Sequence, residues 1–112
     1  MFNPTLGQAW ALLAVAGLLE VGWAVGMKAT DGFSRPLPSL AVLAVALLSF
    51  WLLGLAMKAL PVGTAYAVWV GIGAAGAALL GIVLFDEPAG AARIGCIALI
   101  VAGVLGLKLL HD

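Results

Sequence analysis

The sequence predicts an all-α integral membrane protein with four transmembrane helices in each subunit. Composition is the first observation: 65% of the 112 residues are hydrophobic and 9% are charged, whereas a soluble domain is about half apolar and about a quarter charged. The second observation is that the apolar residues form four segments, each within the range of about 17–25 residues that crosses a bilayer as a helix. We therefore expect a multi-pass protein whose surroundings are the lipid bilayer.

Three short polar segments separate the predicted spans. Residues 29–39, 58–61 and 86–93 each combine charged residues with at least one proline, and such segments end helices and form turns. Connections this short require consecutive helices to pack as antiparallel neighbours, so residues 1–112 are expected to form a single domain. The predicted spans are residues 6–27, 40–57, 63–85 and 94–110.

Several kinds of function are excluded by what the sequence lacks. The formal net charge is +0 and there is no basic patch, which argues against a nucleic-acid partner. Cys96, the one cysteine, excludes an intrachain disulfide and is interpreted as a small hydrophobe. With no nucleophile–base pair, metal-ligand spacing or phosphate-binding loop, we expect no enzyme activity, no metal and no other cofactor. His111 follows the last span and is expected to be solvated.

Glu20 is the one ionisable side chain between Gln8 and Lys28, in the middle of the first span. A charged side chain at the centre of a membrane helix costs about 2.5–3.5 kcal/mol on insertion scales, so such residues usually mark a substrate or proton pathway. The alternative is a structural carboxylate, satisfied by a hydroxyl or a backbone group. A desolvated carboxylate can exchange its proton near neutral pH, so Glu20 can hold a proton and a cation in turn. This is the minimum chemistry of a proton-coupled cation transporter.

Aromatic side chains are expected around Glu20. Gly17 and Trp23 lie three residues to either side of it and share its helix face; Gly17 leaves room beside the carboxylate and Trp23 supplies an aromatic face. In the third span, Tyr66 and Trp69 have the same spacing, so Trp69 offers a second aromatic wall and the Tyr66 hydroxyl can reach a carboxylate. Aromatic faces attract cations, and a carboxylate pairs with a planar guanidinium through two hydrogen bonds. The set predicts a site for a small cation that donates hydrogen bonds.

Four polar or aromatic residues in the spans also have a structural interpretation that needs no binding site. Tyr66 and Trp10 also fit the aromatic belt at the membrane interface, which we accept for Trp10 and leave open for Tyr66. Ser49 is a hydroxyl deep in the second span, but serine in a membrane helix often bonds its own backbone. Trp51, in the same span, is assigned to packing or to contact with lipid.

Small residues recur in the third and fourth spans. Gly71 and Gly73 lie at the middle of the third span, where they give clearance for packing or form a hinge for alternating access. In the fourth span, small residues recur at three- and four-residue spacing, which lets helix backbones approach closely in lipid. We assign this stripe to helix packing between subunits. Its members are Gly95, Ala98, Ala102, Gly103 and Gly106.

The charges at the span ends predict almost no preference between two orientations. With the N-terminus inside, the inner segments hold Lys58 and Lys108, and the outer loops hold Lys28, Arg35 and Arg93. Lys and Arg near span ends normally set the orientation, and two against three gives almost no bias. Either the chain has a single, weakly specified orientation, or it inserts both ways up.

In combination, these features resemble the small multidrug resistance family, and most of all its guanidinium exporter subtype. The resemblance covers nearly the whole chain and departs locally at Gly95-Cys96. The subtype is indicated by Trp23, three residues after Glu20, together with Ser49. The matching segments are AGLLEVGWAVGMK, TDGFSRPLPS, AMKALPVGTAYAVWVGIGAAGAALLGIVLFDEP and LIVAGVLGLKL.

The resemblance implies an antiparallel, dual-topology homodimer in the bacterial cytoplasmic (inner) membrane. In that arrangement both copies of Glu20 line one shared site and titrate as a coupled pair. Two oppositely inserted chains supply the symmetry that larger transporters obtain from inverted repeats. The fourth helix, with Gly103, matches the dimerisation element of the family.

The resemblance also implies a role for each site residue. Glu20 matches the ligand for protons and guanidinium, and Ser49 would orient it by a hydrogen bond. Tyr66 would bond a glutamate in a state-dependent way. The remaining matches are Gly17, Trp23 and Trp69 around the site and Gly71 and Gly73 at the kink of the family.

The expected function is proton-coupled antiport that exports guanidinium and small guanidinyl cations. The alternative is a broad-specificity small multidrug exporter of quaternary ammonium cations, which the hydrogen-bonding residues Ser49 and Trp23 disfavour because a quaternary ammonium donates no hydrogen bond. A third interpretation is a non-transporting membrane scaffold with a structural Glu20, in which Glu20→Gln would leave function intact.

Overall fold

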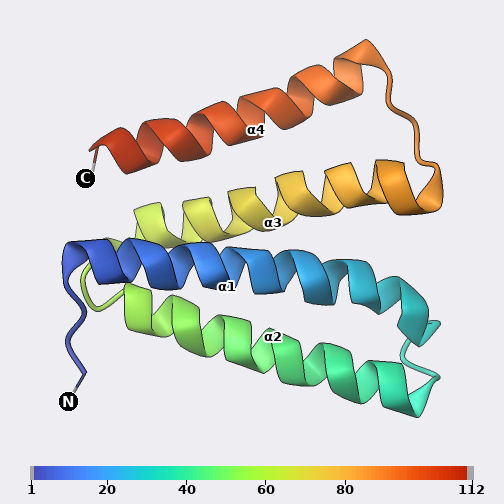
Figure 1. The fold of residues 1–112 in the computed structure, drawn as a ribbon, viewed down its shortest axis with the longest axis horizontal. Coiled ribbons are helices and arrows are strands. Elements are labelled where there is room, and N and C mark those ends of the chain that lie inside the picture. Colours follow the sequence, from blue (N-terminus) through green and yellow to red (C-terminus); the bar gives the residue numbers. More distant parts are fainter. Residues whose placement is uncertain (1, 111–112) are drawn as a thin grey trace.

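Four long helices account for most of the described chain. The computed structural model describes residues 2–110, so the expectation for His111 lies outside the described residues. Within this range, each of the four helices is long and apolar enough to cross a membrane, which makes the chain a multi-pass membrane protein. In chain order the elements are α1 (Leu6–Gly26), the short 3-10 helix η1 (Met27–Thr30), α2 (Pro36–Ala56), α3 (Val62–Phe85) and α4 (Ala91–Leu110) (Figure 1).

Helix α1 begins at a capping box formed by Thr5 and Gln8. The Gln8 backbone N–H donates to Thr5 Oγ1 over 3.1 Å, and the Thr5 backbone N–H donates to Gln8 Oε1 over 3.0 Å. Two N–H groups that the start of a helix leaves without an intrahelical partner are satisfied in this way. The box therefore fixes the first turn of the helix that carries Glu20.

Two helices begin earlier than the sequence predicts. Helix α2 starts at Pro36, whereas the predicted span starts at residue 40 and residues 29–39 are predicted to form a turn. The first residues of a helix need no partner for a backbone N–H, and the fixed φ of proline suits the helix. The prolines of this segment therefore open α2 instead of belonging to the turn. Helix α4 likewise starts at Ala91 and not at residue 94.

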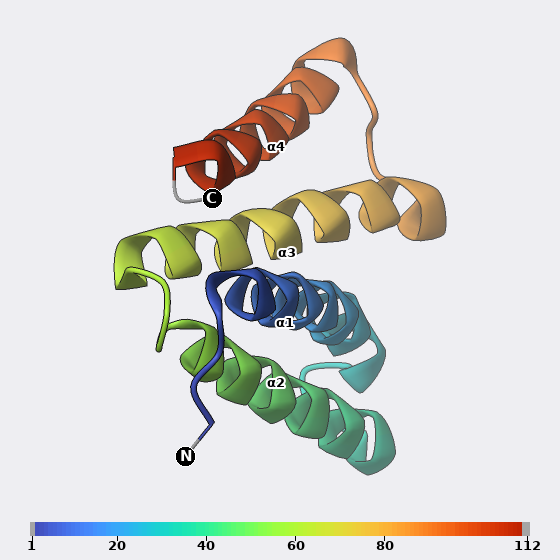
Figure 2. The same ribbon diagram turned by 60° about the vertical axis from the view of Figure 1, so that its left-hand side comes forward.

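The helices lie side by side in a flat layer. Figures 1 and 2 show α1 between α2 and α3, with α4 on the far side of α3. The Cα atoms of the described chain extend over 38 × 37 × 16 Å, so the layer is much thinner than it is wide. Both broad faces of the layer are uncovered within one subunit, and large apolar side chains such as Leu47 and Val83 are exposed on the helices.

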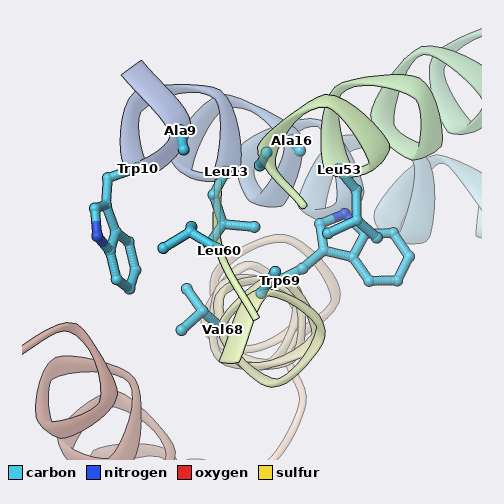
Figure 3. Close-up of a cluster of buried hydrophobic side chains, with 10 residues drawn as sticks. Ala9, Trp10, Leu13, Ala16, Leu53, Leu60, Val68 and Trp69 are labelled. Atoms are coloured by element: carbon cyan, nitrogen blue, oxygen red, sulfur yellow. The ribbon is translucent and has the colours of Figure 1, made fainter. Parts of the chain in front are cut away.

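The buried core lies where the first half of α1 meets the end of α2 and the start of α3 (Figure 3). Leu13 and Ala16 of α1 are fully buried, and Trp69 of α3 is nearly so. Because lipid tails are as apolar as these side chains, close packing holds the helices together more than any difference in hydrophobicity. The cluster comprises Ala9, Trp10, Leu13, Ala16, Leu53, Ala56, Leu60, Ala65, Val68 and Trp69.

Candidate functional site

Glu20 lies on α1 and faces α3 across a close contact between the two helices. A Cβ atom added at Gly73 of α3 would overlap the Glu20 carboxyl group, so that group lies directly against the α3 backbone. The carboxylate oxygen Oε1 is buried and has no hydrogen-bond partner among residues 2–110. Glu20 is also the one acidic residue within α1 to α4. The membrane-spanning part of the subunit therefore contains a single acceptor group able to carry a full negative charge.

Ser49 connects all three inner helices through two hydrogen bonds. Its hydroxyl donates to the backbone carbonyl of Ala16 on α1 over 2.7 Å, and it accepts the indole N–H of Trp69 on α3 over 3.0 Å. In an α-helix the carbonyl of Ala16 is also the acceptor of the Glu20 backbone N–H. Ser49 thus holds the turn of α1 that carries Glu20.

This arrangement differs from the bond that the family resemblance implies. The resemblance implies a hydrogen bond from Ser49 to Glu20, but the one hydroxyl hydrogen of Ser49 is used by Ala16. Ser49 is fully buried. In this conformation it can orient Glu20 through the α1 backbone and not through the carboxylate.

Four aromatic rings form a row across α1, α2 and α3. The ring of Phe50 packs edge-to-face against Trp23, with centroids 6.0 Å apart, and against Trp69, with centroids 5.6 Å apart. Tyr66 continues the row, because its ring centroid lies 5.6 Å from that of Trp69. The row brings together the three aromatic residues predicted from the sequence. Such edge-to-face pairs are worth about 0.5–1.5 kcal/mol each beyond their buried area.

Phe50 is the member of this row that sequence reasoning missed. It follows Ser49 directly in an otherwise apolar stretch, where it reads as ordinary packing. The available signal was its depth, because it lies in the middle of the second span, next to a buried hydroxyl. Within one subunit, Phe50 and Tyr66 are about half exposed. These two members of the row therefore lie at surfaces of the layer that the subunit leaves uncovered.

Trp23 carries the second unsatisfied polar atom of the site. Its indole nitrogen Nε1 is buried and donates to no acceptor in the described part of the chain. Trp23 follows Glu20 by three residues on α1, so the two unpaired groups lie one turn apart on one helix. A buried donor and a buried acceptor without partners indicate a binding site for a ligand or a contact with a second chain.

The predicted glycines make close contacts between helices. A Cβ atom at Gly17 would come within 2.7 Å of Ile72 on α3, so Ile72 fills the space that the sequence assigns to the surroundings of the carboxylate. Gly71 faces Val104 of α4 in the same way. Helix α3 runs without interruption from Val62 to Phe85. These contacts agree with packing clearance for Gly71 and Gly73, while their use as a hinge stays a prediction.

The stripe of small residues on α4 faces away from the other helices. Ile97 is the one buried residue of this helix, and added Cβ atoms at its three glycines would meet nothing within 4 Å. The stripe is therefore not used for packing within the subunit, and its use between subunits stays a prediction. Its members are Gly95, Ala98, Ala102, Gly103 and Gly106.

Charged residues gather where α1 and α3 end, outside the apolar spans. Arg93 Nη2 donates to Glu87 Oε1 over 3.0 Å, and Lys28 Nζ lies 5.0 Å from the centroid of the Phe85 ring. Within residues 2–110, no three His, Cys, Asp or Glu side chains lie close enough together to hold a metal ion.

A flat layer of four membrane-length helices with one intramembrane carboxylate defines a small multi-pass membrane protein. The chain belongs to the small multidrug resistance family, because the family described as Small Multidrug Resistance protein matches residues 8–100. The Guanidinium exporters of Escherichia coli (strain K12) and Yersinia pseudotuberculosis serotype I are each 58% identical to it over 102 residues, covering 91% of this chain and 97% and 98% of theirs. The Guanidinium exporter of Salmonella typhimurium (strain LT2) is 57% identical, over 91% of this chain and 97% of its own. The family predicted from the sequence is confirmed.

Proposed function

We propose that this protein exports guanidinium and small guanidinyl cations across the bacterial inner membrane in exchange for protons. The observation that carries the proposal is the Glu20 carboxylate, which lies within a membrane-length helix and has a buried oxygen unpaired among residues 2–110. The similar proteins described above support the choice of cation, because they are named guanidinium exporters. The protein would act as a transporter and not as an enzyme.

Exchange of a proton for guanidinium at Glu20 would couple the two fluxes. Guanidinium is planar and carries only donors, so an ionised carboxylate can receive it through two parallel N–H···O hydrogen bonds. A protonated carboxyl has lost one of these acceptor positions and its charge. Proton and guanidinium therefore compete for Glu20, and one carboxylate cannot hold both at once. This competition supports antiport with a single side chain.

The aromatic row favours a small flat cation over a bulky one. Trp23, one turn from Glu20 on α1, is joined to Phe50 and Trp69 by edge-to-face contacts, and cations are attracted to ring faces most strongly where water is excluded. The Trp69 indole N–H is used by Ser49 and the Ser49 hydroxyl hydrogen by Ala16, so neither donor competes with a substrate for Glu20. The unpaired N–H of Trp23 is available to donate to a carboxylate.

The working unit in this proposal is an antiparallel, dual-topology homodimer. Three observations support it: the subunit is a thin layer with uncovered faces, the small residues of α4 are unpacked, and the charges at the span ends give almost no orientation bias. Two chains inserted in opposite senses would place two copies of Glu20 in one site. Their carboxylates would titrate as a coupled pair, and the two orientations would supply two access states.

A transport assay with purified protein in liposomes tests the proposal. We expect guanidinium and methylguanidinium to drive proton flux and tetraalkylammonium ions to drive none. Glu20→Gln should abolish the flux while the protein still inserts and dimerises. Glu87→Gln is the matched control, because Glu87 lies in a loop outside the spans and should keep the wild-type flux.

Three other outcomes would replace the proposal. Flux driven by tetraalkylammonium ions and not by guanidinium would indicate a broad exporter of quaternary ammonium cations. Flux that survives Glu20→Gln would make the carboxylate structural and would place the exchange of protons for cations at another group. A wild-type protein that shows no flux with any of these cations would favour the non-transporting membrane scaffold.

A further inference from the structure

Gly73 forms a notch in α3 that the Glu20 carboxyl group fills. A Cβ atom at this position would overlap three atoms of Glu20, namely Oε1, Cδ and Cγ. The overlap involves the whole end of the side chain and not one flexible atom. Any residue other than glycine at position 73 would therefore force the carboxylate to move.

A second contact fixes the position of Glu20 along α3, and so its alignment with the notch. Ile72 of α3 projects against Gly17 of α1, where an added Cβ atom would come within 2.7 to 3.0 Å of three Ile72 atoms. Glu20 of α1 projects the other way, against Gly73 of α3. The two contacts are neighbours on α3 and lie one turn apart on α1, so sliding one helix along the other would break both. The register between α1 and α3 thus sets the position of the carboxylate.

Shape and not hydrogen bonding holds the carboxylate in this position. Oε1 has no hydrogen-bond partner in the described part of the chain, although it is buried. The hydroxyl that the family resemblance assigns to it, that of Ser49, donates to Ala16 instead. The backbone of α3 is helical at Gly73 and uses its N–H and carbonyl groups within the helix. The Glu20 carboxyl group therefore occupies space that is free because Gly73 has no side chain.

We propose that Gly73 is a positioning residue for Glu20, whose notch sets where the carboxylate exchanges its proton for guanidinium. The proposal rests on the function proposed above for Glu20. It distinguishes the two glycines that the sequence predicts as a hinge, because Gly71 faces Val104 on α4 and Gly73 faces the carboxylate on α1. One turn of α3 therefore contacts α4 through Gly71 and the site through Gly73.

The test compares Gly73→Ala with Gly76→Ala in the full-length protein. Gly76 lies one turn further along the same interface, and an added Cβ atom there would overlap Val21 and not Glu20. For Gly73→Ala we expect the dissociation constant of guanidinium to rise by about 10- to 100-fold, the size of effect that misplacement by about 1 Å produces. The pH at which guanidinium binding is half-maximal should also shift. Gly76→Ala should keep the wild-type pH midpoint, even where it lowers thermal stability as much.

A conservative variant provides the rescue. Glu20→Asp shortens the side chain by one methylene, which withdraws the carboxylate from a Cβ atom at position 73. The double variant Gly73→Ala/Glu20→Asp should therefore bind guanidinium more tightly than Gly73→Ala alone, a positive coupling between the two sites. If Gly73→Ala fails to assemble, recovery of the assembled protein in the double variant is the same rescue.

Three results would overturn the proposal. The first is a shift of the pH midpoint of guanidinium binding in Gly76→Ala as large as that in Gly73→Ala. The second is a double variant whose loss of guanidinium affinity is the sum of the losses in the two single variants. The third is an equal loss of affinity in Gly71→Ala and Gly73→Ala without rescue, which would favour a hinge. A direct titration of the Glu20 carboxyl by nuclear magnetic resonance separates this proposal from the transport function. A wild-type protein that binds no guanidinium would remove the proposed function, while a Gly73-specific shift in that titration would still establish the notch.

Discussion

The interface between α1 and α3 and the outer surface of α4 are both rich in small residues, yet only the first is filled. Gly17, Gly73 and Gly76 each face a side chain of the opposite helix, whereas Gly95 and Gly103 face open space. Small residues let helices approach closely in lipid, but they do not say which helix will approach. The difference separates a packed interior, which holds Glu20, from a surface that has no neighbour within one chain.

The largest effect on the inner packing is expected from Ser49→Ala. This change removes both hydrogen bonds of Ser49 and leaves the indole N–H of Trp69 buried without an acceptor. We expect a loss of about 1–2 kcal/mol in the free energy of unfolding, together with weaker guanidinium binding. Thermal unfolding in detergent and a binding titration measure the two effects.

Ser39→Ala is the matched control for this prediction. Ser39 donates to the carbonyl of Arg35, four residues earlier in the chain, so its bond is local to the start of α2. It should lose less stability and keep the wild-type affinity for guanidinium. Equal losses of stability in the two variants would mean that the hydrogen bonds of Ser49 between helices stabilise the protein no more than a local bond within one helix.

The next prediction concerns the outer helix α4, where a substitution should weaken contact between subunits and leave the packing of the inner three helices unchanged. Gly103→Val adds a branched side chain where the subunit offers open space, so the fold of one subunit should be unchanged. If α4 packs against a second subunit, the same side chain obstructs that contact, and we expect the dimer dissociation constant to rise at least about tenfold. Chemical cross-linking across a dilution series in detergent measures this. A dimer of unchanged strength would show that this surface faces lipid.

A smaller effect is expected at Phe50, in the middle of the aromatic row. Phe50→Leu removes two edge-to-face contacts, with Trp23 and Trp69, and should cost about 1 kcal/mol of stability. It should also weaken the preference for guanidinium over larger cations in the liposome assay. Trp51→Leu is the control, because Trp51 is the next residue and is 62% exposed. Matching phenotypes would indicate a general effect of aromatic residues on α2.

The smallest effect should come from the ion pair between Glu87 and Arg93. Both side chains are more than a third exposed, so water and salt screen their attraction. Pairs of this kind contribute about 0.2–1 kcal/mol, and Glu87→Gln should fall at the low end of that range. Thermal unfolding at low and high salt measures the effect, which should vanish at high salt. A larger loss would show that the loop before α4 carries more of the fold than its exposure indicates.

The sequence was sufficient for the elements of the fold, while the roles that it predicts for the site residues stay predictions. Runs of apolar residues broken by charges and prolines predicted four helices, and an isolated Glu20 predicted a functional carboxylate. The start of α2 was misplaced because proline ends a helix and also begins one well. Local sequence does not distinguish these two uses at Pro36.

Contacts between helices could not be predicted in the same way. Each helix is apolar on nearly all sides, so no polar face indicates which residues point inward. Whether Ser49 reaches Glu20 or Ala16 depends on the rotation and register of two helices. For the same reason the sequence indicates neither the ring contacts of Phe50 nor the contact between Gly73 and Glu20.

The thinness of the subunit has a consequence for the amount of protein a cell needs. A layer with Cα atoms only 16 Å deep leaves Phe50 and Tyr66 of the aromatic row about half exposed. If the site is shared by two chains, as proposed above, it exists only after two chains have met. Transport would then rise with the square of the number of chains per membrane area while the protein is scarce, and in proportion to that number once pairing is complete. The amount of protein needed for export would then depend on how often two chains meet in the bilayer as well as on the transport rate of each pair.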